Sequence, residues 1–175
     1  MKNLVLLVGG MLALAFFWSP LPVGAQVAVR VTGGGTGTFG ADLDGDGDID
    51  GSQFGIGVTI RANGSAQGHF LCLMAGRSDI LGLPVMAVQG PVSSGDVNGD
   101  GSVTFSGVGT VNLGNGTIFG GIPFAVTVTA GGPGVGTLQL TVIGAFDGVP
   151  GDTLLGNGNY DLPVETVASG RIKIH

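Results

Sequence analysis

The sequence predicts an all-β fold, built either as a single antiparallel β-sandwich of the jelly-roll or Ig-like type or as a barrel. Glycine accounts for 37 of the 175 residues, which disfavours helices. Hydrophobic residues make up 43% of the chain and charged residues only 10%, the reverse of the composition of disordered chains. Segments of alternating or β-branched character recur along the chain between Gly, Asn or Pro residues, as in strands joined by tight turns.

The N-terminal segment 1–25 predicts a secretory signal peptide. Lys2 supplies the positive charge, an apolar run follows from Leu4 to Trp18, and Val23-Gly24-Ala25 is a small-residue cleavage site. A run of about 15 residues is shorter than the roughly 20 that a membrane-spanning helix needs. We therefore expect a mature protein that begins near Gln26, is secreted to the cell surface or extracellular space, and has no membrane span.

Residues 26–175 are expected to form one domain, long enough for a substantial core. Asn63-Gly64 lies between two alternating runs and is the strongest hairpin signal in the chain. Cys72 is the only cysteine, so no intramolecular disulfide is available, and we expect it to be a buried small hydrophobe. The predicted strands cover residues 27–32, 36–41, 54–62, 66–75, 84–90, 102–106, 108–113, 122–130, 135–146 and 164–174.

The first part of this domain, residues 26–35, fits two interpretations. Val27, Val29 and Val31 alternate in a β-branched run, and three glycines follow. The run is either the first strand of its own sheet or an N-terminal arm with a glycine hinge. Such an arm would add as a strand to a neighbouring subunit and give a head-to-tail fibre.

Two short loops contain seven of the 12 acidic residues. The first, DLDGDGDIDGSQF, has the spacing of an EF-hand calcium loop, in which alternate residues turn oxygens toward one ion and Gly at position 6 permits a sharp turn. Gln53 stands at position 12, where a bidentate Glu is usual. The predicted ligands and the turn glycine are Asp42, Asp44, Asp46, Gly47, Asp48 and Asp50, at positions 1, 3, 5, 6, 7 and 9.

The second loop, DVNGDGSVT, repeats this spacing with fewer carboxylates. Position 12 is Gly107, which has no side-chain ligand, so we expect the first loop to bind Ca²⁺ more tightly. Asp-Gly and Asn-Gly pairs also suit plain hydrophilic turns. The repeated spacing nevertheless favours calcium as the cofactor of both loops. The second set comprises Asp96, Asn98, Asp100, Ser102 and Thr104.

Two resemblances accompany these patterns. The stretch GDVNGDGSV resembles the calcium loops of dockerin modules, but strand-type sequence follows it in place of a helix, so we interpret both loops as strand connections. Residues 33–175 resemble the post-COAP-type family of secreted bacterial all-β domains in the motifs GTGTFG, Gly68-His69, FAVTVTAGGPGVGTLQLTV and ASGRIKIH. This resemblance implies a surface-exposed, non-catalytic module in which the acidic loops are insertions.

Catalytic function is not expected from this sequence. Glu165 is the only glutamate, His69 and His175 are the only histidines, and neither a nucleophile elbow nor a metal-hydrolase motif occurs. The other acidic residues outside the loops, Asp147 among them, have no context that supports catalysis. The acidic composition also disfavours a nucleic-acid partner.

The function predicted from the sequence is therefore that of a secreted, calcium-stabilised, non-catalytic structural protein that self-associates as a homo-oligomer or fibre. The alternative is a calcium-dependent module for adhesion or for binding an extracellular polysaccharide. The few aromatic residues left after removal of the signal peptide disfavour a stacking platform for sugars. Asn63 and Asn115 lie in glycosylation sequons, although Asn-Gly pairs are more often plain turns.

Overall fold

The computed structural model describes residues 27–42, 47, 50–78 and 83–175. Within these residues the chain contains strands and no α-helix, which confirms the all-β prediction; none of them forms a helix long and apolar enough to cross a membrane. The strands are β1 (Val27–Thr38), β2 (Gly51–Arg61), β3 (Ala66–Ser78), β4 (Leu83–Val97), β5 (Val103–Asn112), β6 (Ile118–Thr129), β7 (Thr137–Val142), β8 (Tyr160–Asp161) and β9 (Glu165–Ile174).

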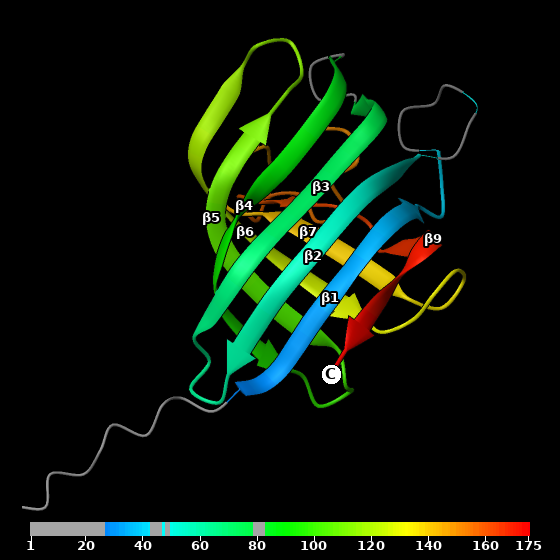
Figure 1. The fold of residues 1–175 in the computed structure, drawn as a ribbon. Coiled ribbons are helices and arrows are strands. Elements are labelled where there is room, and N and C mark those ends of the chain that lie inside the picture. Colours follow the sequence, from blue (N-terminus) through cyan, green and yellow to red (C-terminus); the bar gives the residue numbers. More distant parts are fainter. Residues whose placement is uncertain (1–26, 43–46, 48–49, 79–82) are drawn as a thin grey trace, which may run out of the picture.

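One antiparallel sheet curves until it closes on itself as a ring (Figure 1). Strands β1 to β7 pair in chain order, and β9 pairs with β1 on one side and with β7 on the other. The seam between β7 and β9 is short, with only Thr137↔Thr166 and Leu138↔Glu165 in register. A single closed sheet is the barrel alternative of the prediction, so the two-sheet sandwich is wrong.

The interior of the ring is filled by side chains. Alternate residues of β2, from Ser52 to Ile60, are buried, as expected for a strand with one face toward the core. Phe70, Phe105 and Phe124 are each 0% exposed, and the ring centroid of Phe70 lies 5.8 Å from that of Phe105 and 5.6 Å from that of Phe124. A ring of eight strands has an interior just wide enough for side chains to fill. Chemistry with an outside ligand is therefore expected at the ends or on the outer face.

Two strand breaks predicted from glycines are absent. Residues 27–32 and 36–38 belong to the single strand β1, and residues 103–106 and 108–112 belong to β5. Residues 39–41, 102 and 113, which were also predicted as strand, lie outside these two strands. A Cβ on Gly35 would overlap the carbonyl oxygen of Ser169, and one on Gly107 would overlap that of Pro91. These glycines allow neighbouring strands to approach closely. Each strand therefore continues through the glycine at which the sequence predicted a break.

The N-terminal run 27–32 lies within the ring. Val29 and Val31 are buried, and β1 pairs with β2 from Val27 to Thr38 and with β9 from Val31 onward. In this chain the run is the first strand of its own sheet. Addition to a neighbouring subunit, which stays a prediction, would require β1 to leave both partners.

Candidate metal sites at the two ends of the ring

The two acidic loops belong to opposite ends of the ring. Neighbouring strands are antiparallel, so the β1–β2, β3–β4 and β5–β6 connections leave at one end, which we call the first-loop end. The β2–β3, β4–β5 and β6–β7 connections leave at the other, the second-loop end (Figure 1). The calcium spacing of each loop predicts an ion site. Because the loops lie at opposite ends, these would be two separate sites and not one shared ion.

The described part of the first loop has its two ends tied together. The backbone N–H of Gly47 donates to Oδ2 of Asp42 over 2.8 Å, which joins positions 6 and 1 of the calcium spacing. Gly47 has φ +100, a conformation that favours glycine. At the base, the N–H of Phe39 donates to the carbonyl of Asp50 over 2.9 Å. The predicted ligands that lie outside the described residues are Asp44, Asp46 and Asp48.

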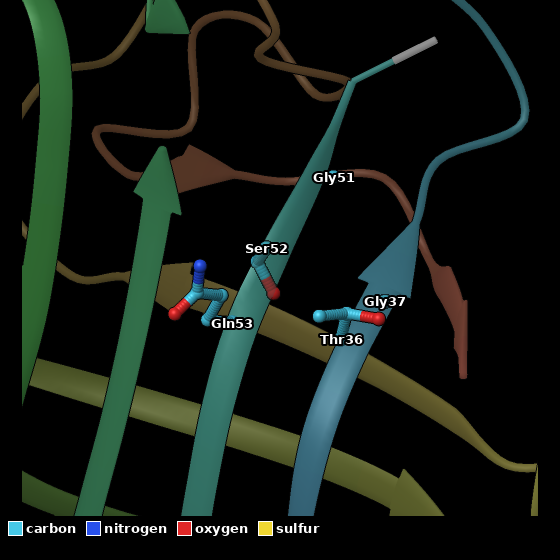
Figure 2. Close-up of a pocket in the computed structure, with 5 residues that line it drawn as sticks. All are labelled: Thr36, Gly37, Gly51, Ser52 and Gln53. Atoms are coloured by element: carbon cyan, nitrogen blue, oxygen red, sulfur yellow. The ribbon is translucent and has the colours of Figure 1, made fainter. Parts of the chain in front are cut away.

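A shallow polar pocket lies at the base of this loop. Its volume is about 200 Å³, and Figure 2 shows the lining residues at the ends of β1 and β2. Gln53, the residue at position 12 of the loop, lines it with an exposed side chain and pairs with Thr36 of β1. Ser52 also lines the pocket, but its side chain is buried and contacts the ring interior.

Beneath this pocket is a buried carboxyl group for which the sequence predicts no role. Glu165 is 2% exposed, and Oγ of Ser52 lies 2.7 Å from its Oε1 and 2.6 Å from its Oε2. A Cβ on Gly37 would overlap the carboxylate, so a glycine is needed there. Burial raises the pKa of Glu165 to about 7, against a smaller lowering by the hydrogen bonds from Ser52. Burial, followed by the charge of Glu165, raises the pKa of the neighbouring Cys72 to about 12.

A local signal for this position existed in the sequence. Glu165 and Val167 are two residues apart in the predicted strand 164–174, so their side chains lie on the same face. In the structure both are buried on the inner face of β9. Cys72 is buried as predicted.

The second loop is a tight hairpin turn between β4 and β5. The N–H of Asn98 donates to the carbonyl of Ser102 over 2.8 Å, and that of Gly101 donates to the carbonyl of Asn98 over 3.0 Å. Gly101 has φ +84, whereas Gly99 has no positive φ. The DG pair of the calcium spacing therefore also serves the turn itself.

Replacement of Gly101 by alanine is expected to destabilise the protein by about 1–2 kcal/mol, because an L-residue is strained at positive φ. A Cβ at Gly101 or at Gly99 meets no atom within 4 Å, so packing contributes to neither change. Urea unfolding of Gly101→Ala and of the control Gly99→Ala measures the difference. Equal stabilities of the two variants would contradict the turn conformation described here.

Side chains of four predicted ligands gather on this hairpin. Oδ1 of Asp100 accepts hydrogen bonds from the N–H and the hydroxyl of Ser102, over 2.9 and 2.6 Å. Nδ2 of Asn98 donates to the hydroxyl oxygens of Ser102 and Thr104, over 2.8 and 3.0 Å. The hydrogen bonds from the side chain and backbone of Ser102 lower the pKa of Asp100, which is therefore ionised at neutral pH.

Asp96, the fifth predicted ligand of the second loop, pairs across the strands with Thr104, and its Oδ1 accepts a hydrogen bond from the N–H of Val97 over 2.8 Å. Asp96 and Thr104 both line a shallow pocket of about 290 Å³, together with the hydroxyl-bearing residues Ser94 and Ser106. This pocket opens beside the β2–β3 hairpin, whose Gly64 contributes to its wall.

The donor set of the second loop suits a hard cation, because carboxylate, amide and hydroxyl oxygens are the ligands that Ca²⁺ takes in proteins. Asn98 presents its NH₂ group to the two hydroxyls, so an ion at this point requires the amide to turn its oxygen inward. In the part of the chain that the structure describes, no three His, Cys, Asp or Glu side chains are grouped as a metal site. The other predicted ligands of the second loop, beside its two carboxylates, are neutral oxygens.

A third acidic connection, between β7 and β9, was not recognised as a unit in the sequence. The carboxylate of Asp147 accepts the N–H groups of Gly156 and Gly158, over 2.8 and 2.9 Å. The carboxylate of Asp152 accepts three N–H groups, and the one from Gly148 makes the largest contribution to lowering its pKa. These two carboxylates therefore accept hydrogen bonds from the backbone N–H groups of a long irregular segment.

Both sequons lie at exposed hairpin tips. Oδ1 of Asn63 accepts hydrogen bonds from the N–H and hydroxyl of Ser65, and Oδ1 of Asn115 accepts one from the N–H of Thr117 over 2.9 Å. The two asparagines thus stabilise their turns, and glycan attachment at either stays a prediction.

Comparison of this chain with protein families, with curated proteins and with solved structures finds no match. The resemblance to post-COAP-type domains and to dockerin loops therefore stays a prediction from sequence.

Proposed function

We propose that this protein is a secreted structural module of the cell surface or extracellular space, in which Ca²⁺ rigidifies the connections at the ends of a closed β-ring. The observation that carries the proposal is the hydrogen bond from the N–H of Gly47 to the carboxylate of Asp42. It joins positions 1 and 6 of the calcium spacing, and the acidic residues at positions 3, 5 and 9 follow the same alternation in the sequence.

Electrostatics supports the same proposal. The chain has a net charge of −6, and seven of its 12 acidic residues are confined to the two loops. Carboxylates this close together in the sequence repel one another unless a cation neutralises their charge. The chain also has a single cysteine and so no internal disulfide, which leaves bound ions as a means of tying the loops.

Calcium is expected to stabilise the protein against unfolding by about 2.7 kcal/mol when its concentration is a hundredfold above its dissociation constant, because the ion binds the folded loops in preference to the unfolded chain. Titration calorimetry and thermal unfolding, with calcium and with a chelator, measure uptake and stabilisation. The double variant Asp44→Asn/Asp46→Asn should lose the tighter binding event, whereas Asp79→Asn, outside both loops, should retain it. Absence of uptake by the unaltered protein would end the proposal.

Self-association is the second part of this proposal. Several large apolar side chains are exposed on β5 and β6, with Val108 51%, Ile118 61% and Phe119 38% exposed. Light scattering and electron microscopy of the intact protein, with calcium and with chelator, test assembly directly.

A second candidate function is calcium-dependent binding of an extracellular polysaccharide. It is favoured by the pocket beside Asp96, whose wall combines a carboxylate with the hydroxyls of Ser94, Thr104 and Ser106. A cation held by Asp96 would coordinate hydroxyl groups of a sugar, and the hydroxyls of these residues would hydrogen-bond to the same sugar. Polysaccharide retention that is lost on chelation and in Asp96→Asn, with discrete monomers in solution, would favour this function over assembly.

A further inference from the structure

Four Asn-Gly pairs lie in connections between the strands of the ring: Asn63-Gly64, Asn98-Gly99, Asn115-Gly116 and Asn157-Gly158. Such pairs can react without an enzyme. The backbone nitrogen of glycine attacks Cγ of asparagine, a C–N bond forms, and the bond from Cγ to Nδ2 breaks. Ammonia leaves, carrying the proton of the glycine amide, and a five-membered succinimide remains. Water then opens this ring at one of its two carbonyls and gives aspartate or isoaspartate.

The reaction requires that neither the glycine N–H nor Nδ2 of the asparagine is held by a hydrogen-bond acceptor. Asn157-Gly158 fails on both counts, because Nδ2 of Asn157 donates to Asp161 over 2.6 Å and the N–H of Gly158 donates to Asp147 over 2.9 Å. Asn98 fails because its Nδ2 donates to both Ser102 and Thr104.

The Asn63-Gly64 pair is blocked at its nucleophile. The N–H of Gly64 donates to the carbonyl of Arg61 over 2.9 Å, so this hydrogen bond must break before the nitrogen can attack. Asn63 also has its Oδ1 engaged by both the N–H and the hydroxyl of Ser65, which restrains the rotation of its side chain.

Asn115-Gly116 satisfies the requirements that the other pairs fail. Both residues are exposed at the tip of the β5–β6 hairpin. Within the described part of the chain, neither Nδ2 of Asn115 nor the N–H of Gly116 has a hydrogen-bond acceptor. Oδ1 of Asn115 accepts one hydrogen bond, from the N–H of Thr117, whereas Oδ1 of Asn63 accepts two. No heavy atom lies within 4 Å of the position of a Cβ on Gly116, so the turn has room to rearrange.

We infer that Asn115 is a site of spontaneous deamidation in the folded protein and that the other three Asn-Gly pairs are protected by the hydrogen bonds of the fold. The modification places a new negative charge at the first-loop end of the ring. In chains that carry a glycan at Asn115, the amide nitrogen is substituted and the reaction is blocked.

The test uses the intact, unglycosylated protein, kept folded in mildly alkaline buffer and analysed over time by peptide mapping with mass spectrometry. Asn115 is expected to convert at least about tenfold faster than each of the other three asparagines. Tenfold corresponds to about 1.4 kcal/mol, which is the order of one lost hydrogen bond. The Asn115→Gln variant should lose the main deamidated species, whereas the matched Asn63→Gln variant should retain it.

The same measurement in denaturant separates the fold from the local sequence. Without the hydrogen bonds, the four pairs should react at rates within about threefold of one another. A threefold difference in rate corresponds to less than the free energy of one hydrogen bond. Faster reaction at any other pair in the folded protein, equal rates at all four, or a preference for Asn115 that persists in denaturant would each overturn the inference.

Discussion

Replacement of Phe70 by alanine is expected to destabilise the protein by about 3–5 kcal/mol, enough to unfold a large fraction of the chains if the domain is only marginally stable. Phe70 is 0% exposed and contacts the aromatic rings of Phe105 and Phe124 from other strands of the ring. Alanine removes this packing and leaves a cavity that a closed sheet cannot easily fill, because each strand is held on both sides.

Leu71→Ala is the matched control for this change. Leu71 is the next residue of β3, points to the outer face and is 39% exposed, so its replacement should cost about 0.5–1 kcal/mol. Urea unfolding monitored by circular dichroism measures both variants in the same buffer. Similar losses at the two positions would contradict the assignment of the inner and outer faces of β3.

Glu165→Gln is expected to change how stability depends on pH. The pKa of Glu165 is raised to about 7 in the folded protein from an ordinary value of 4.5, so the folded state binds a proton that the unfolded chain releases. The contribution of this group is therefore complete below about pH 4.5, falls as pH rises, and is fully lost above about pH 7. A shift of this size corresponds to roughly 3 kcal/mol. Glutamine is neutral throughout and should not show this loss.

The measurement is the free energy of unfolding in urea across this pH window, with chelator present so that calcium binding does not contribute. Subtraction of the Glu165→Gln series from that of the unaltered protein cancels the other carboxyl groups. Ser52→Ala provides a second check, because the hydrogen bonds from the Ser52 hydroxyl lower the pKa of Glu165 and their removal should move the loss of stability to higher pH. A difference curve that is flat with pH would refute the buried, proton-binding state of Glu165.

Several strands were predictable because their signal is local. The alternation of apolar and small residues in 54–62 and 66–75 predicted β2 and β3 to within about three residues, and Asn63-Gly64 predicted the turn between them. The hairpin of the second acidic loop was likewise predictable as a turn from its Asp-Gly pair. Each of these features depends on residues that are neighbours in the chain.

Features that join distant segments were not predictable in this way. The hydrogen bonds of Ser52 to Glu165 connect residues 113 positions apart, and the two-residue strand β8 exists only because β7 lies beside it. The Asp147 and Asp152 carboxylates organise a connection whose shape depends on where β7 and β9 meet. Local sequence patterns do not predict these pairings of distant residues.

The sequence by itself determined that the protein is all-β, that Cys72 is buried, and that its acidic residues gather in two loops with the spacing of calcium ligands. Only the tertiary structure decided that one sheet closes through β9, that the two loops lie at opposite ends, and that Ser52 hydrogen-bonds to the lone glutamate. The physical reason is that side-chain alternation is set by the backbone of each strand, whereas closure depends on which distant strand edges can pair while the side chains fill the interior.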